Sequence, residues 1–242
     1  MSKNMNLILP KRTSRRQLLQ WSGLSGAGLL LNGCASSLFA EQVGQLSEPL
    51  NQSIEALMLS QKAVPEFPVK AIDPAEKLII NSFDFVPKLD PTQFRLTIDG
   101  EVERPLQLSL SDLQKLPLTT MNIRHVCVEG WAAIVQWNGV RLRELAALVQ
   151  LKANVRYVYF KSADGYYESW DLASAVQPQT LMAYQRNGQP LSIANGAPLR
   201  LASPIKLGYK LSKWVTQITF LSQLMPMKGY WEDQGYEWFA GL

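Results

Sequence analysis

The chain has 242 residues, 47% of them hydrophobic and 10% aromatic, which supplies one large core or two modest ones and excludes an intrinsically disordered chain. Its net charge is +4, but five of the 24 basic residues and none of the 20 acidic residues precede Glu41. The remainder is close to neutral and has no basic run, so no nucleic-acid partner is expected.

The first 40 residues predict a cleavable export signal. Positive charge over residues 3–16 precedes a mildly apolar run over 18–31, which is shorter than the about 20 residues of a membrane-spanning helix. Residues 14–19, Ser-Arg-Arg-Gln-Leu-Leu, resemble the twin-arginine signal of proteins that are exported folded, often around a cofactor. We therefore expect a periplasmic protein. A buried amphipathic helix is the alternative interpretation.

The end of the apolar run resembles a lipoprotein processing site in which Cys34 would be lipidated. A peptidase cut near Ala40, releasing a soluble protein, is the alternative. Either outcome removes Cys34 from ordinary thiol chemistry, and membrane attachment is expected only through this lipid or a partner. Residues 41–73, rich in Gln, Ser, Glu and Pro, predict a linker or surface arm, and one domain is expected over 74–242.

The domain begins with alternating apolar and polar residues over 94–100, which predict a strand, and residues 111–117 predict a short helix closed by proline. The spacing of apolar residues predicts a helix over 140–151. Further strands are predicted over 156–161, 181–186, 198–202 and 213–221. Strands dominate and helices are interspersed irregularly, which favours an α+β domain with mixed and antiparallel β-sheets over a doubly wound sheet.

The only histidine, His125, lies two positions from Cys127. Four interpretations of Cys127 are open: a small buried hydrophobe, a disulfide with Cys34, a Cys–His nucleophile, and a ligand of a metal whose other ligands come from an organic cofactor. In a strand the two side chains would share a face, and a protonated histidine or Arg124 would favour the thiolate. A zinc site would need more Cys or His ligands. The metal–cofactor interpretation requires positive charge elsewhere for a phosphate-bearing cofactor.

The segment Cys127-Val-Glu-Gly-Trp131 resembles the molybdenum-ligating segment of the sulfite oxidase superfamily, closest to its periplasmic branch of methionine-sulfoxide reductase catalytic subunits. Further segments resemble the family in the same order along the chain. These segments are 81–85, 195–201, 208–213 and 229–238, and the resemblance covers about residues 79–242. It implies a sulfite-oxidase-type molybdopterin-binding fold.

The resemblance implies one molybdenum held by Cys127 and by a single molybdopterin, with no haem in this chain. The residues implied to bind the cofactor are Asn81, Phe83, Asp84, Cys127, Ser162, Asn195, Arg200, Leu211, Ser212 and Lys213. Taken one motif at a time, blander interpretations exist: Lys210 and Lys213 as a solvated face, Asn195-Gly196 as a turn, Arg200 as the cap of a strand edge, and the C-terminal aromatic residues as core.

His125 and Arg124 are the catalytic candidates, because an imidazole or guanidinium would polarise a bound oxygen; a structural histidine is the alternative. We expect Glu129 to accept hydrogen bonds from backbone or arginine near the metal. Trp131 and Trp137 are expected to pack.

The implied activity is oxygen-atom transfer, namely reduction of a small or protein-borne S-oxide with electrons from a membrane haem protein. Sulfite oxidation and a cofactor-free periplasmic binding module are the alternatives. Sulfite oxidases carry Arg-Asn-His where this chain reads Asn81-Ser82-Phe83, which disfavours sulfite. Phe83 and Asp84 also replace a tyrosine and a glutamate of the reductase branch. The extra C-terminal dimerisation domain of larger sulfite oxidases is not found, so a monomer is expected.

Overall fold

The computed structural model describes residues 63–242, so the predicted export signal, Cys34 and most of the predicted arm lie outside the described residues. The strands are β1 (Arg95–Gly100), β2 (Leu106–Ser109), β3 (Thr119–Val126), β4 (Ala132–Arg141), β5 (Tyr157–Ser162), β6 (Tyr167–Asp171), β7 (Leu181–Arg186), β8 (Gln189–Pro190), β9 (Arg200–Ala202) and β10 (Val215–Leu221). The α-helices are α3 (Leu110–Lys115), α4 (Leu142–Val149) and α5 (Leu172–Ala175). Single 3-10 turns are η1 (Val69–Ala71), η2 (Ala75–Lys77), η3 (Ile193–Asn195), η4 (Gly208–Lys210) and η5 (Glu232–Gln234).

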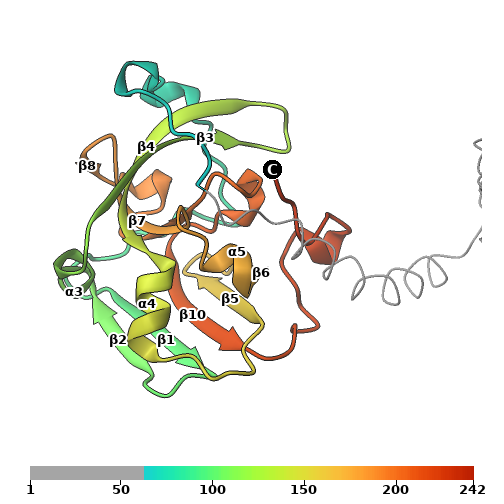
Figure 1. Ribbon diagram of the computed structural model, residues 1–242. Helices are drawn as coiled ribbons and strands as arrows, with labels where there is room; N and C mark the ends of the chain where they lie inside the picture. Colours follow the sequence, from blue (N-terminus) through green and yellow to red (C-terminus); the bar gives the residue numbers. More distant parts are fainter. Residues whose placement is uncertain (1–62) are drawn as a thin grey trace, which may run out of the picture. The chain divides into compact units, whose positions relative to one another are not determined.

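The strands form two sheets (Figure 1). The first has the order β2-β1-β10-β5-β6 and is mixed, because β1 and β10 run parallel while the other neighbours are antiparallel. The second is antiparallel, with the order β3-β4-β7-β8 and β9 beside β7. The expected α+β class with mixed and antiparallel sheets is confirmed.

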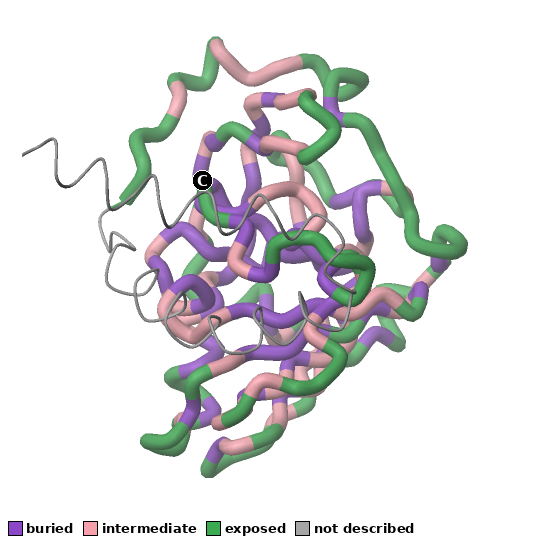
Figure 2. Tube along the Cα trace, turned by 90° about the vertical axis from the view of Figure 1, so that its right-hand side faces the viewer, coloured by how far each residue is buried: buried purple, intermediate pink, exposed green. Residues whose placement is uncertain are grey.

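The main core lies between the two sheets and α4. Alternation in β1 buries Leu96 and Ile98, and these join Phe220 of β10 and Met182 of β7 in one apolar cluster. Figure 2 shows the buried stretches gathered in the interior and the exposed ones in the turns. A smaller cluster around Trp137 lies under the β3–β4 hairpin.

Helix α4 is shorter than predicted at both ends. Its apolar stripe is buried as the periodicity predicts, with Leu142 and Leu145 fully covered. However, Val140 and Arg141 still belong to β4, where they pair with β7. At the other end Gln150 adopts φ +56°, which stops the helix.

The predicted strands correspond to β1, β5, β7, β9 and β10, with boundaries that agree to within two residues. The β3–β4 hairpin was not predicted, and it carries the conspicuous Cys127 turn. In that turn Cys127 N–H donates to Trp131 O at 2.9 Å, and Gly130, at φ +88°, donates its N–H to Cys127 O at 3.1 Å. The hairpin therefore fixes the backbone of the thiol.

Residues 63–73 are the described end of the predicted arm, and they run beside the hairpin. Phe67 N–H donates to Asn122 O of β3 at 2.9 Å. Asp73 N–H donates to Ile134 O at 2.9 Å, and Ile134 N–H donates to Asp73 Oδ2 at 2.8 Å. These bonds cover edges of β3 and β4 and lead the chain into the next segment at 78–83. Within residues 63–242 no helix has the length and hydropathy to span a membrane.

Candidate active site

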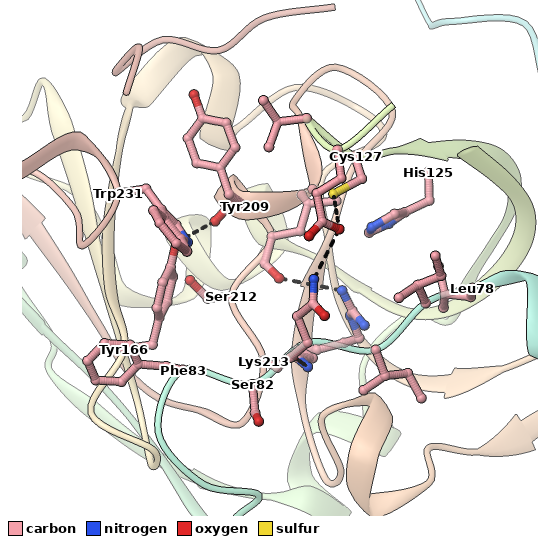
Figure 3. Close-up of a pocket in the computed structure, with 18 of the residues that line it drawn as sticks. Leu78, Ser82, Phe83, His125, Cys127, Tyr166, Tyr209, Ser212, Lys213 and Trp231 are labelled. Carbon is pink, nitrogen blue, oxygen red and sulfur yellow. Dashed lines mark hydrogen bonds between the residues drawn. The ribbon is translucent and has the colours of Figure 1, made fainter. Parts of the chain in front are cut away.

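The Cys127 turn forms one wall of a cavity of about 380 Å³ (Figure 3). The other walls come from residues 78–83, from the turn between β5 and β6, from residues 194–213 and from the C-terminal segment. The lining residues are Leu78, Ile79, Ile80, Asn81, Ser82, Phe83, His125, Cys127, Val128, Glu129, Trp131, Asp164, Tyr166, Ala194, Asn195, Arg200, Gly208, Tyr209, Leu211, Ser212, Lys213, Tyr230, Trp231 and Tyr236.

Cys127 presents a half-buried free thiol to this cavity. Its Sγ–H donates to Glu129 Oε2 at 3.5 Å. Burial raises the pKa of the thiol, and the Glu129 carboxylate acts in the same direction. The thiol is therefore protonated at neutral pH in the protein alone, which is the opposite of what a cysteine nucleophile needs.

Glu129 organises this wall by accepting three hydrogen bonds on one carboxylate oxygen. Besides the thiol, Oε2 accepts from Trp131 Nε1 at 2.9 Å and from Asn81 Nδ2 at 3.1 Å. The expectation of backbone or arginine donors is wrong, because the nearest donors are an indole, an amide and the thiol. Trp131 is correspondingly part of the cavity wall and not merely packing, whereas Trp137 is fully buried.

His125 is buried between the two indoles, with ring centroids 5.7 Å from Trp131 and 6.4 Å from Trp137. Burial, followed by repulsion from Arg200 and Lys213, lowers its pKa to about 3. The imidazole is therefore neutral and forms no ion pair with Cys127, which removes the support for a Cys–His nucleophile. Its Nδ1 has no hydrogen-bond partner within residues 63–242.

Three residues predicted for the site lie outside the cavity wall. Arg124 is adjacent to His125 in β3 and so faces the opposite side, where its exposed guanidinium lies 5.3 Å from the Phe67 ring centroid. Asp84 is exposed and does not line the cavity, although Phe83, the residue before it, does. Ser162 is buried at the end of β5.

The structure brings the other predicted residues to one cavity. They are Asn81, Phe83, His125, Cys127, Asn195, Arg200, Leu211, Ser212 and Lys213.

Arg200 and Lys213 give the cavity a cationic end. Arg200 is buried 4.6 Å from the Trp137 ring centroid, and its N–H groups donate to the carbonyls of Asn195 and Leu211 at 3.2 and 3.4 Å. Burial lowers the pKa of Arg200 to about 9 and, with repulsion from Arg200, that of Lys213 to about 7. Neither forms an ion pair within residues 63–242. Asp164 is the carboxylate that acts on Lys213, and none acts on Arg200. A buried cation without an ion-pair partner favours binding of an anion.

The alternative interpretation is wrong for the two lysines but agrees with the contacts of Arg200. The Arg200 guanidinium donates to the backbone carbonyls of Asn195, Leu201 and Leu211, as a strand cap would, and it also lines the cavity. Lys210 is fully buried and Lys213 is half-buried, so they are not a solvated face. Lys213 Nζ donates to the carbonyl of Asn81, which ties the cationic end to the Cys127 wall.

Two glycines let backbone segments pack closely against residues that line the cavity. A Cβ on Gly208 would lie 3.2 Å from His125 Nε2 and 3.3 Å from Val126 O. Gly196, at φ +100°, would place a Cβ 3.0 Å from a side-chain carbon of Lys213. Any larger residue would displace the groups that shape the site. The hydroxyl of Ser212 is buried there without a partner among the described residues.

An aromatic wall, which sequence reasoning assigned to core packing, lines the remaining side. It consists of Tyr230, Trp231 and Tyr236, and we use "aromatic wall" for these three residues. Phe83 meets Tyr230 edge-on at 4.4 Å between centroids, while Trp231 and Tyr236 stay partly exposed. The unusual density of aromatic residues in 229–238 was the available signal.

Two further lining residues, Asp164 and Tyr166, were also missed. Asp164 Oδ1 accepts from Tyr166 N–H at 3.1 Å in the β5–β6 turn. Burial raises the pKa of Asp164. No motif marks this turn, so only the tertiary structure reveals that it reaches the cavity.

Comparison with known proteins agrees with this geometry. Residues 84–231 match the oxidoreductase molybdopterin binding domain. The chain is 36% identical over 239 residues to the putative protein-methionine-sulfoxide reductase subunit YedZ1 of Azospira oryzae, covering 94% of this chain and 88% of that protein. It is 31% identical over 241 residues to the protein-methionine-sulfoxide reductase catalytic subunit MsrP of Burkholderia mallei, covering 88% and 70%.

Among solved structures, the fold is similar to that of the sulfane dehydrogenase SoxCD from Paracoccus pantotrophus. The TM-score is 0.54 at 24% identity, over 57% of this chain and 40% of that chain. At this identity the likeness concerns the fold alone.

Proposed function

The chain belongs to the oxidoreductases with a molybdopterin-binding domain, and from this premise we propose that it reduces S-oxides at a molybdenum held by Cys127 and one molybdopterin. The bound group supplies two-electron oxygen-atom transfer. The observation that carries the proposal is that a free thiol, a buried arginine (Arg200) and a half-buried lysine (Lys213) line one cavity, and neither basic residue forms an ion pair among residues 63–242.

The residues present fit this group. Cys127 offers a soft sulfur ligand on a rigid hairpin turn, and metal binding would replace its proton. Arg200 and Lys213 would hold the phosphate, with the partnerless hydroxyl of Ser212 as a further donor. Gly208 lets the anion-binding segment pack directly against His125 and the Cys127 turn, which keeps these groups together in one wall. Asn81, Phe83, Asn195 and Leu211 would complete the cradle.

His125 would act as a neutral hydrogen-bonding group near the reacting oxygen, because burial keeps its imidazole uncharged. Glu129 would hold Trp131 and Asn81 in place beside the metal ligand. Arg124 has no part in this proposal, because it faces away from the cavity.

A neutral S-oxide suits the cavity better than sulfite does. Arg200 and Lys213 are its only lysine or arginine linings among the described residues, and both are needed for the cofactor's phosphate. A sulfite dianion would therefore have to share their charge. The aromatic wall instead offers apolar surface to a sulfur substituent.

The apolar rim of the cavity favours the proposal that the substrate is larger than the cavity itself, namely methionine sulfoxide within a polypeptide. Several lining side chains are also exposed to solvent: Ile79 by 52%, Ile80 by 42%, Val128 by 48% and Trp231 by 38%. An exposed apolar patch around a site indicates a surface that is covered in use. The names of both sequence relatives, which refer to protein methionine sulfoxide, support the same substrate.

We further propose a periplasmic location, electrons from a membrane haem protein, and a monomeric chain attached to the membrane only through that partner or a lipid on Cys34. The twin-arginine-like residues 14–19 support export. Both relatives are named as subunits, which supports a separate electron donor.

The test uses protein exported from a host that makes molybdopterin. With an artificial electron donor, we expect reduction of an oxidised, unfolded polypeptide at a higher kcat/KM than free methionine sulfoxide, and no oxidation of sulfite with an electron acceptor. Sulfite oxidation without S-oxide reduction would establish the oxidase alternative. Protein without molybdenum from such a host would favour a binding module.

A further inference from the structure

Beneath the cavity, Lys210 lies between two glutamates. Its Nζ donates to Glu168 Oε1 at 2.5 Å and to Glu232 Oε1 at 2.5 Å, and also to the carbonyl of Ser169 at 3.1 Å. All three charged side chains are almost completely buried, and none of them lines the cavity. Ion pairs of this kind resist separation, because removing one partner leaves an uncompensated buried charge.

The cluster has one carboxylate more than its single ammonium needs. With every group ionised it would carry a net negative charge in the interior, and burial raises the pKa of Glu168 well above its ordinary value. Burial thus favours the protonated form of Glu168. Each glutamate places an oxygen 2.5 Å from Lys210 Nζ, so one partner is left if the other is removed.

The backbone is shaped around this cluster. Gly229 forms a β-bridge with Glu168, and a Cβ on Gly229 would lie 2.8 Å from Glu168 Oε1 and closer still to Glu232. A second link runs parallel to the ion pair, since the Tyr209 hydroxyl donates to Glu237 O at 2.6 Å. The two chain segments therefore meet closely at this point.

These segments are two different walls of the cavity. Residues 208–213, here called the anion loop, carry Ser212 and Lys213, whereas 229–238 carries the aromatic wall. Lys210 belongs to the first segment and Glu232 to the second. We infer that Lys210 and Glu232 are positioning residues that hold the aromatic wall against the anion loop and thereby set the width of the substrate end of the cavity. The effect that we expect on S-oxide kinetics rests on the proposed function, whereas the effect that we expect on the structure of 229–238 does not.

The test compares Glu232→Ala with the matched control Glu168→Gln. Glu232→Ala cuts the tie to the aromatic wall while Glu168 can still pair with Lys210, so we expect amide hydrogen exchange in 229–238 to accelerate by about tenfold or more. Molybdenum content should match the wild type, KM for an S-oxide should rise about tenfold and kcat should stay within about twofold. Glu168→Gln replaces the carboxyl by an amide of the same shape and leaves the Lys210–Glu232 ion pair in place, so exchange and KM should stay within about twofold of wild type.

Glu232→Gln is the second variant, and it decides the matter if Glu232→Ala fails to fold. Its side-chain amide oxygen can still accept a hydrogen bond from Lys210. The amide exchange rate in 229–238 should therefore be faster than in wild type and in Glu168→Gln, but slower than in Glu232→Ala. Exchange in 229–238 that equals the wild type in every Glu232 variant that folds, Glu232→Gln alone if Glu232→Ala does not fold, would overturn the inference, as would a fall in kcat at constant KM. A wild-type enzyme that turns over no S-oxide would refute the proposed function, while the exchange and molybdenum measurements would still decide this inference.

Discussion

At the scale of single residues, the surroundings of Arg200 are the most direct indication of an anionic ligand. Its guanidinium is buried among backbone carbonyls, and no carboxylate of residues 63–242 pairs with it. We predict that Arg200→Met lowers the molybdopterin content of the purified protein at least about tenfold, because a charge-assisted contact to phosphate is lost. The cofactor is measured by fluorescence after oxidative release.

Arg124→Met is the matched control. It removes the same charge from a site outside the cavity, where Arg124 only covers the Phe67 ring. Its cofactor content should equal that of the wild type, and an equal loss in both variants would contradict the assignment of Arg200.

The contrast between Arg124 and His125 shows what the sequence could predict at this scale. The sequence singled out the neighbourhood of Cys127, which lines the cavity, because a lone histidine beside a cysteine is conspicuous in any chain. It did not reveal which neighbour faces the cavity, since that depends on which face of the β3–β4 hairpin is buried in the fold: His125 lies on the buried face and Arg124 on the exposed one. The aromatic wall was missed for a similar reason: exposure of Trp231 and Tyr236 is set by distant segments.

At the scale of elements, the apolar positions of α4 differ in burial and should therefore differ in their contribution to stability. Leu145 is fully buried in the main core, whereas Leu148 on the same helix is 41% exposed. We predict that Leu145→Ala lowers the free energy of unfolding by about 2–5 kcal/mol. Leu148→Ala should cost less than about 1 kcal/mol. Denaturant unfolding measures both, and similar losses would show that the helix packs differently.

Low pH should weaken the contact between the arm at residues 63–73 and strand β4, because this contact depends on the Asp73 carboxylate. A hydrogen bond from Ile134 N–H, together with one from Lys77, lowers the pKa of Asp73 below its ordinary value of 3.8. A carboxyl whose pKa is depressed by folding stabilises the native state above the unfolded pKa, and this contribution is lost as pH falls through the folded pKa.

We therefore expect the stability difference between wild type and Asp73→Ala to be constant above about pH 5 and to shrink below pH 3.8. Parallel denaturation series at several pH values measure it. A difference that grows on acidification would refute the role of this carboxylate.

The elements themselves were partly predictable. Helix α4 and strand β1 follow from local apolar spacing. The β3–β4 hairpin was overlooked even though Met121, Ile123 and His125 alternate on the buried face of β3. The second half of β4 lacks alternation because Trp137 to Val140 are buried on both faces, which only the packing of two sheets explains.

At the scale of the whole molecule, the cavity is assembled from segments far apart in the sequence. Its thiol comes from a hairpin turn, its cations from residues 200 and 213, and its aromatic wall from the C-terminal segment. The family resemblance pointed to the thiol and the two basic residues, whereas the contacts of Lys210 with its two glutamates, which join two of these walls, have no signature in the sequence. Long-range contacts of this kind arise only in the folded chain.

The most direct test of the account is the ligand set of the metal in the exported protein. X-ray absorption at the molybdenum edge should show three sulfur neighbours in the wild type, one from Cys127 and two from a single molybdopterin, and two in Cys127→Ser. An unchanged sulfur number in Cys127→Ser, or molybdenum-loaded wild type in which Cys127 reacts freely with a thiol reagent, would contradict it.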